Sequence, residues 1–197
     1  NYQIIFLLLY VVFFLKNTIK TKNIYVNNKI FFLLLTFSFI LFSVVIASEL
    51  NLGWDAKYFY YIKSLFFVES LRLFELDSFE HNKWHPHLGS YIWAFFWQLP
   101  FFNIEYFGRL FYLFIFLFSL LYLIFSTKNN NYIKSIFFLG ILIFVFNYER
   151  FSGLQEILIF SLLLIASQIL FNLSYKTKLI NVLTIFLISN LIIWIKS

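Results

Sequence analysis

The chain has 197 residues, of which 62% are hydrophobic and 12% are charged, and its mean hydropathy is +0.84. A soluble domain is roughly 45–50% apolar and about 25% charged, and a chain of this length has too little interior to hide the excess. Lipid is therefore the expected solvent, which disfavours water-soluble enzymes, nucleic-acid-binding domains and disordered regulators. The net charge of +6 needs no nucleic acid to explain it, and the chain has no cysteine for disulfides or thiolate metal sites.

The first residues lack the features of a normal start. The chain begins at Asn1 inside an apolar run, contains no Met, and has neither the basic leader nor the small-residue cleavage site of a signal peptide. We therefore expect a fragment or an odd product, in which residues 2–15 are the remaining part of a truncated membrane span.

Long apolar segments recur along the chain, and a spanning helix needs about 20 such residues. The candidate spans are residues 2–15, 30–48, 110–126, 135–148, 157–175 and 179–195. A seventh apolar stretch, Gly89 to Phe102, would reach only about 21 Å at about 1.5 Å per residue. This stretch is either a short span or a helix lying in the membrane interface.

The distribution of lysines chooses between these two topologies, because cytoplasmic loops collect Lys and Arg. The loops 16–29 and 127–134 and the loop after Tyr175 contain lysines and no acid. They share one side only if Gly89–Phe102 does not cross. The predicted fold is therefore all-α, a polytopic transmembrane helix bundle. Its large external segment, 49–106, is rich in Trp and carries interfacial helices over about 56–75 and 89–102.

Asp55 is the first candidate for chemistry, since it follows the predicted 30–48 span and lies beside Trp54. A carboxylate that is partly desolvated at the mouth of a membrane helix has a raised pKa and is a better general base. The alternative, which the chemistry of the residue alone favours, is that Asp55 caps the N-terminus of the predicted helix 56–75.

A second group of candidates opens the Gly89–Phe102 stretch. His85 and His87 flank Pro86, and Lys83 lies two residues earlier, so that the group could bind a metal or a phosphate. Zinc needs three or four ligands. Candidates for the missing ligands are His81, Asp55 and Glu80. The alternative is a polar turn that enters an interfacial helix with Pro86 at its start.

The loop before the predicted 157–175 span holds a third group, Glu149, Arg150 and Glu156. The guanidinium of Arg150 suits a phosphate. Glu156 lies where a carboxylate also stabilises a helix through the helix dipole, and this is its alternative role. Arg109, at the start of the 110–126 span, is interpreted as an interfacial anchor.

The order of these features resembles the C-type (GT-C fold) membrane glycosyltransferases. This superfamily includes the protein O-mannosyltransferases and the aminoarabinose transferases of lipid A. The similarity covers about residues 30–175 and rests on Asp55 in an external loop, on His85-Pro86-His87-Leu88 opening an apolar helix, and on Gly108-Arg109-Leu110 entering the next span. The sequence departs from the family where His87 replaces a second Pro, and where Asp55 lacks an adjacent second acid. The family's chains are also much longer and have more spans, so the resemblance implies an N-terminal fragment of a GT-C-like fold that is inactive on its own.

The resemblance implies an enzyme that moves a sugar from a polyprenyl-phosphate donor to a hydroxyl of a glycan, lipid or protein acceptor, with inversion. Asp55 would be the general base, and Lys83, His85 and Arg150 would bind the departing phosphate. Glu156 would orient the acceptor or help to hold a divalent metal. Whether the site holds such a metal stays open, and its possible ligands are His85, His87 and Asp55. The implied location is a bacterial inner membrane, with the site on its external face.

A non-enzymatic function stays open beside this one. The chain would then be a membrane scaffold, a flippase or a transporter component, and Asp55 would only cap a helix. The spans lack ionisable residues that could relay protons or ions, which disfavours a transporter but not a scaffold.

Overall fold

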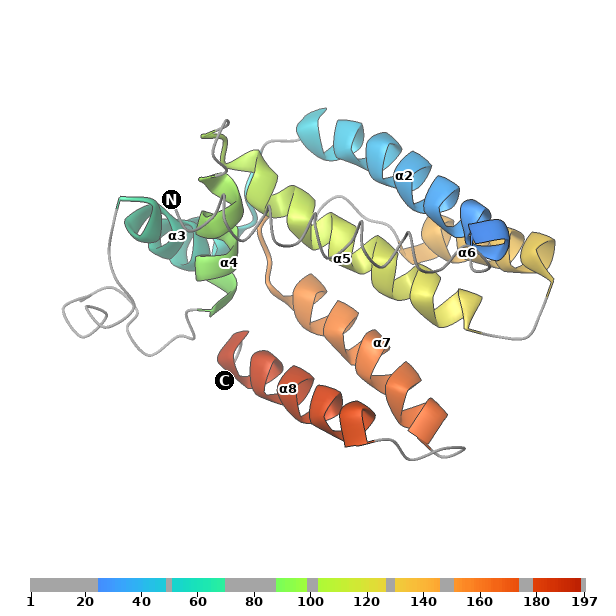
Figure 1. Cartoon of the computed structure of the whole chain (residues 1–197). Coiled ribbons are helices and arrows are strands. Elements are labelled where there is room, and N and C mark those ends of the chain that lie inside the picture. Colours follow the sequence, from blue (N-terminus) through green and yellow to red (C-terminus); the bar gives the residue numbers. More distant parts are fainter. Residues whose placement is uncertain are drawn as a thin grey trace.

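A computed structural model describes residues 25–48, 51–69, 88–98, 103–126, 130–145, 151–173 and 179–195. Over these residues the chain is all-helical, as predicted, with seven α-helices, one π-helical segment and no strand (Figure 1). The elements are α2 (Tyr25–Ser48), η1 (Ala56–Tyr60), α3 (Tyr61–Val68), α4 (Leu88–Trp97), α5 (Tyr106–Phe125), α6 (Asn131–Val145), α7 (Glu156–Leu173) and α8 (Leu179–Ile195).

Five of the six predicted spans fall on α2, α5, α6, α7 and α8, and the segment 2–15 lies outside the described residues. Two helices, Lys29–Ser48 within α2 and Tyr106–Phe125, are long and apolar enough to cross a bilayer. The other apolar helices are shorter in their described parts. Membrane crossing by the five helices stays a prediction.

The apolar runs form helices because Pro is absent from them and their few polar side chains bond to their own helix. In α8 the Thr184 hydroxyl donates to the Ile180 carbonyl at 2.7 Å, and the Asn190 amide donates to the Phe186 carbonyl at 2.9 Å. A polar side chain that bonds one turn back needs no other partner. Such residues therefore fit into a helix with an apolar surface.

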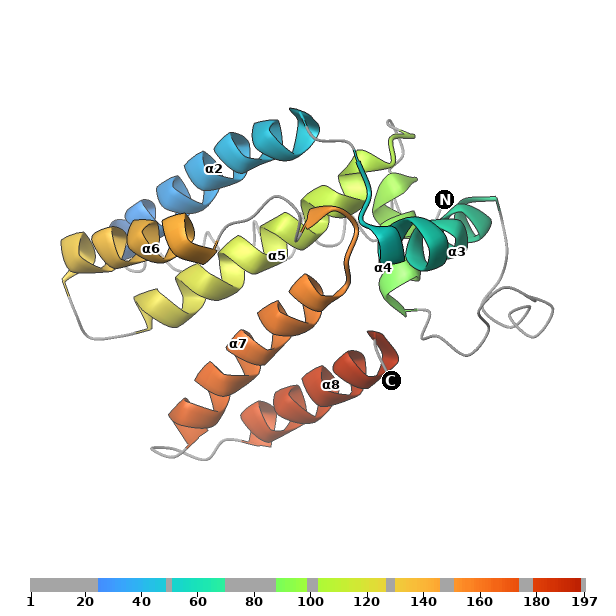
Figure 2. The ribbon, with the colours of Figure 1, turned by 180° about the vertical axis from the view of Figure 1, so that it is seen from behind.

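Helix α5 is the centre of the bundle and packs against α2, α4, α6 and α7, while α8 packs on α7 (Figures 1 and 2). Its buried residues recur at helical spacing, which gives it an inward face along most of its length. Phe116 on this face meets the Phe151 ring at 5.6 Å, so that α5 also contacts the segment that precedes α7.

The two ends of the bundle differ. At one end, where α2 stops and α5 and α7 begin, α3 and α4 form a short layer (Figure 1). We call this the α4 end, and there the Tyr106 hydroxyl donates to the Ser43 carbonyl. At the other end, the Lys29 end, the Phe31 ring of α2 meets the Phe125 ring of α5 at 5.5 Å. The antiparallel pairing of α2 and α5 follows from these contacts.

Helices are present over parts of both segments that were predicted to be interfacial, and their placement in the interface stays a prediction. Helix α4 has 10 residues, about 15 Å long, which is too short to cross a hydrocarbon core of about 30 Å. The predicted helix 56–75 is a continuous helical stretch from Trp54 to Val68, and residues 70–75 lie outside the described part. The two helices pack on each other, so neither lies alone on the surface.

Candidate functional site

Asp55 lies in the first helical turn at the α4 end, and its side chain is exposed. Its backbone is already helical (φ −61°, ψ −39°), and its carboxylate makes no capping hydrogen bond. The backbone closes this turn, with Lys57 N donating to Gly53 O at 2.8 Å. The capping alternative is therefore wrong. The expected desolvation is not supplied by protein packing either, because the carboxylate faces outward.

The five residues after Asp55 form the π-helical segment η1, a rare conformation that often occurs at functional sites. The segment turns Ala56 and Tyr60 into the protein. On the outer side Trp54 is 68% exposed, and its ring lies 5.2 Å from that of Tyr58. Asp55 is thus an exposed acid beside exposed aromatic rings.

The segment that carries Asp55 lies beside the segment that leads into α7. Gly53 N donates to Ser152 O at 2.9 Å. Gly153 has a positive φ of 94°, and a Cβ there would lie 2.9 Å from the Cβ of Ala56. The absence of a side chain at Gly153 therefore lets the two segments touch.

Glu156 follows this contact as the first residue of α7, and its side chain is exposed. The carboxylate is thus placed where the helix dipole favours it, as its alternative role requires. Asp55 and Glu156 are brought to the same end of the bundle on adjoining segments. The other predicted site residues, Lys83, His85, His87 and Arg150, lie outside the described residues.

Trp93 of α4 is the centre of packing at this end and is 0% exposed. Its indole Nε1 donates to Glu105 O at 3.3 Å. A Cβ on Gly108 would lie 2.0 Å from Cδ1 of this ring, and a Cβ on Gly153 would lie 2.4 Å from Cη2. The Trp content of segment 49–106 suggested the membrane interface, whereas the Trp93 ring is enclosed by protein. Glycines on two distant segments were the available sign of a large buried ring.

A partly buried ion pair lies next to Trp93, at the start of α5. Arg109 Nη2 and Glu105 Oε2 are 3.1 Å apart, and the Arg109 side chain is inaccessible. Arg109 Nε and Nη1 and Glu105 Oε1 have no hydrogen-bond partner, which is costly for buried polar atoms. Burial raises the pKa of Glu105, while the charge of Arg109 opposes the rise. The interpretation of Arg109 as an interfacial anchor is therefore wrong.

A neutral polar cluster joins α3, α4 and α8 to Gln155, the residue before α7. Gln155, oriented to satisfy both of its amide atoms, donates to Ile195 O at 3.1 Å and accepts from Ser90 N at 3.0 Å. The Ser64 hydroxyl of α3 lies 3.0 Å from Ser90 O. A Cβ on Gly89 would fall 2.3 Å from Cδ of the Gln155 side-chain amide. Gly89 therefore provides the space that the Gln155 amide occupies.

Lys63 is a further buried charge that the sequence did not indicate. It lies on the inward face of α3 with Ser64 and Phe67. Burial lowers the pKa of Lys63 to about 8. Its position in an apolar segment gave no sign of which way the side chain would face.

The described residues contain no group of three His, Cys, Asp or Glu side chains that could hold a metal. Asp55 and Glu156 alone do not meet the needs of a divalent site, and the two histidines lie outside the described part. Comparison of the chain with protein-family models, with curated proteins and with solved structures found no match.

Proposed function

We propose that the chain is a polytopic membrane protein and that its α4 end carries a glycosyltransferase site. The membrane location is supported by the long apolar helices α2 and α5. It is also supported by exposed apolar side chains on α6, where Phe144 is 89% exposed. Soluble monomers rarely expose large apolar patches, whereas lipid covers them without cost.

The distribution of charge supports an external α4 end. Every acid among the described residues lies at this end: Asp55, Glu69, Glu105 and Glu156. The lysine-bearing loops 16–29 and 127–134, which contain no acid, adjoin the helix termini of the other end. Applied to these two loops, the positive-inside rule favours a cytoplasmic Lys29 end and an external α4 end.

The proposed reaction is transfer of a sugar from a polyprenyl phosphate to an acceptor hydroxyl. The hydroxyl oxygen bonds to the anomeric carbon as the bond from that carbon to the phosphate oxygen breaks, and the electron pair leaves with the phosphate. Asp55 takes the hydroxyl proton. A single displacement inverts the anomeric centre.

One observation carries this proposal: Asp55 is an exposed carboxylate without a capping bond, on a segment hydrogen-bonded to the one that leads to Glu156. A general base must reach a substrate proton, and an exposed side chain at the mouth of the bundle meets that need. Glu156, on the adjoining segment, is proposed to orient the acceptor. Lys83, His85 and Arg150 stay proposed ligands of the phosphate.

The test is turnover of radiolabelled polyprenyl-phosphate sugars by membranes that contain the full-length protein. Asp55→Asn should lower the rate by about 10²–10⁴-fold, the usual contribution of a positioned base. Glu69→Gln is the matched control, because Glu69 is also an exposed acid at the α4 end, and it should leave the rate unchanged. Equal turnover by both variants would remove Asp55 from catalysis. Failure of the wild type to transfer any of the sugars would favour the scaffold alternative.

A further inference from the structure

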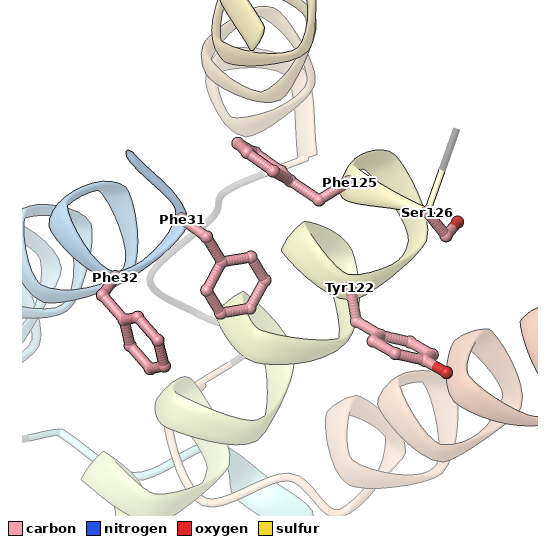
Figure 3. A pocket seen from close by; sticks show the side chains of 5 residues that line it. All are labelled: Phe31, Phe32, Tyr122, Phe125 and Ser126. Carbon is pink, nitrogen blue, oxygen red and sulfur yellow. The ribbon is translucent and has the colours of Figure 1, made fainter. Parts of the chain in front are cut away.

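A pocket of about 300 Å³ opens at the Lys29 end, far from the proposed catalytic site (Figure 3). It lies between Phe31 and Phe32 in the first half of α2 and the C-terminal end of α5. Its lining residues are Phe31, Phe32, Tyr122, Phe125 and Ser126. Its volume lies at the lower limit for small-molecule sites, which run from about 300 to 1,000 Å³.

The aromatic side chains that line the pocket pack against other aromatic side chains. Phe31 meets Phe118 edge-on at 6.0 Å, and Phe118 stacks on Tyr122 at 6.2 Å. Phe32 is 50% exposed and forms an outer wall. The pocket is therefore a mainly apolar space that opens at the surface, and among its described lining residues Tyr122 and Ser126 are the ones with polar side chains.

The charges around this end have one sign. Lys29 is exposed two residues before Phe31. Lys134 Nζ donates to Phe125 O at 3.1 Å and lies 5.4 Å from the Phe125 ring, which fixes a second ammonium beside the pocket wall. All described acids lie at the α4 end. An occupant with an apolar chain and a negative head group would satisfy both the rings and the lysines.

We propose that this pocket binds an acyl chain of an anionic phospholipid, with the lipid phosphate held at Lys29. The inference rests on the proposed membrane location but not on the glycosyltransferase activity. Basic residues at the cytoplasmic surface attract anionic lipids by about 1 kcal/mol per Lys. The positive-inside orientation places the pocket in the leaflet where this attraction acts.

The test uses the full-length protein purified in detergent and titrated with phosphatidylglycerol or phosphatidylcholine, with bound lipid counted by native mass spectrometry. One phosphatidylglycerol should be retained in preference to phosphatidylcholine. Lys29→Gln should weaken the binding of phosphatidylglycerol about fivefold and leave phosphatidylcholine unchanged, since about 1 kcal/mol corresponds to about that factor. Phe32→Ala should weaken the binding of both lipids.

Two control variants separate the pocket from general lipid contact. Phe144→Ala removes a more exposed ring from α6 that does not line the pocket, and Lys57→Gln removes an exposed lysine from the α4 end. Neither should change lipid retention. Equal retention of the two lipids, or equal losses in the test and control variants, would overturn the proposal. Release of the protein from membranes by alkaline carbonate would instead refute the membrane location.

Discussion

Gly108→Ala tests whether Trp93 is as tightly enclosed as the structure indicates. The added Cβ would lie 2.0 Å from Cδ1 of Trp93, whereas ordinary contact begins at 3.4 Å. Either the ring or the start of α5 must therefore move by about 1.4 Å, the difference between these distances. The ring cannot move freely, because it also abuts Gly153 and donates to the Glu105 carbonyl.

The magnitude follows from three effects. Overpacking of a filled core costs roughly 1–3 kcal/mol. Loss of the hydrogen bond from Trp93 to Glu105 adds about 1 kcal/mol. The better helix propensity of Ala over Gly returns about 1 kcal/mol. The net destabilisation is therefore about 1–3 kcal/mol, the sum of these terms.

Gly140→Ala is the matched control, because Gly140 is also helical and a Cβ there meets nothing within 4 Å. This variant should gain up to about 1 kcal/mol from helix propensity alone. Thermal unfolding in detergent, followed by tryptophan fluorescence, measures both. At about 2–4 °C per kcal/mol, the two midpoints should move in opposite directions. Midpoints that rise together would show that Trp93 is not confined by Gly108, and the packing argument would fail.

Two further predictions concern the same end of the molecule. Gly89→Ala should displace the Gln155 amide and lower the free energy of unfolding by about 1–3 kcal/mol. Gln155→Ala should then cost less in the Gly89→Ala background than in the wild type, and a double-mutant cycle measures this difference. The pKa of Lys63 is lowered from 10.5 to about 8, so the folded state binds fewer protons than the unfolded state between these values. The stability of the wild type should therefore rise with pH across this range, and Lys63→Met should lose that slope in unfolding experiments repeated at several pH values. An unchanged slope in Lys63→Met would assign the pH dependence to another group.

The helical architecture was predictable because long apolar segments without Pro favour α-helices over other secondary structures. The predicted 179–195 segment coincides with α8, and the 110–126 segment falls within one to four residues of the ends of α5. The extra turn of α5 begins with Tyr106 and contains the buried Arg109. A charged residue gives no apolar signal, so the pattern could not show that the helix starts earlier.

The site was less predictable, because burial depends on what faces each residue in three dimensions. Trp93, Trp97 and Trp54 are equivalent in the sequence pattern, yet the first two are buried and the third is exposed. The capping of a helix by Asp55 was the simplest interpretation of an Asp before a helix. It fails because the helix already starts at Trp54, one residue before Asp55. The segments of Asp55 and Glu156 are adjacent because the Gly53 N–H donates to the Ser152 carbonyl, and the spacing of residues in the sequence does not indicate this hydrogen bond.

The central claim is that the α4 end is external and the Lys29 end is cytoplasmic. Because the chain contains no cysteine, single cysteines introduced at exposed positions report on sidedness without interference. Glu69→Cys places one at the α4 end, and Asn130→Cys places one between α5 and α6 at the other end. A membrane-impermeant maleimide should label Glu69→Cys in intact cells and Asn130→Cys only after permeabilisation. Labelling of Asn130→Cys in intact cells would contradict the orientation on which the proposed site depends.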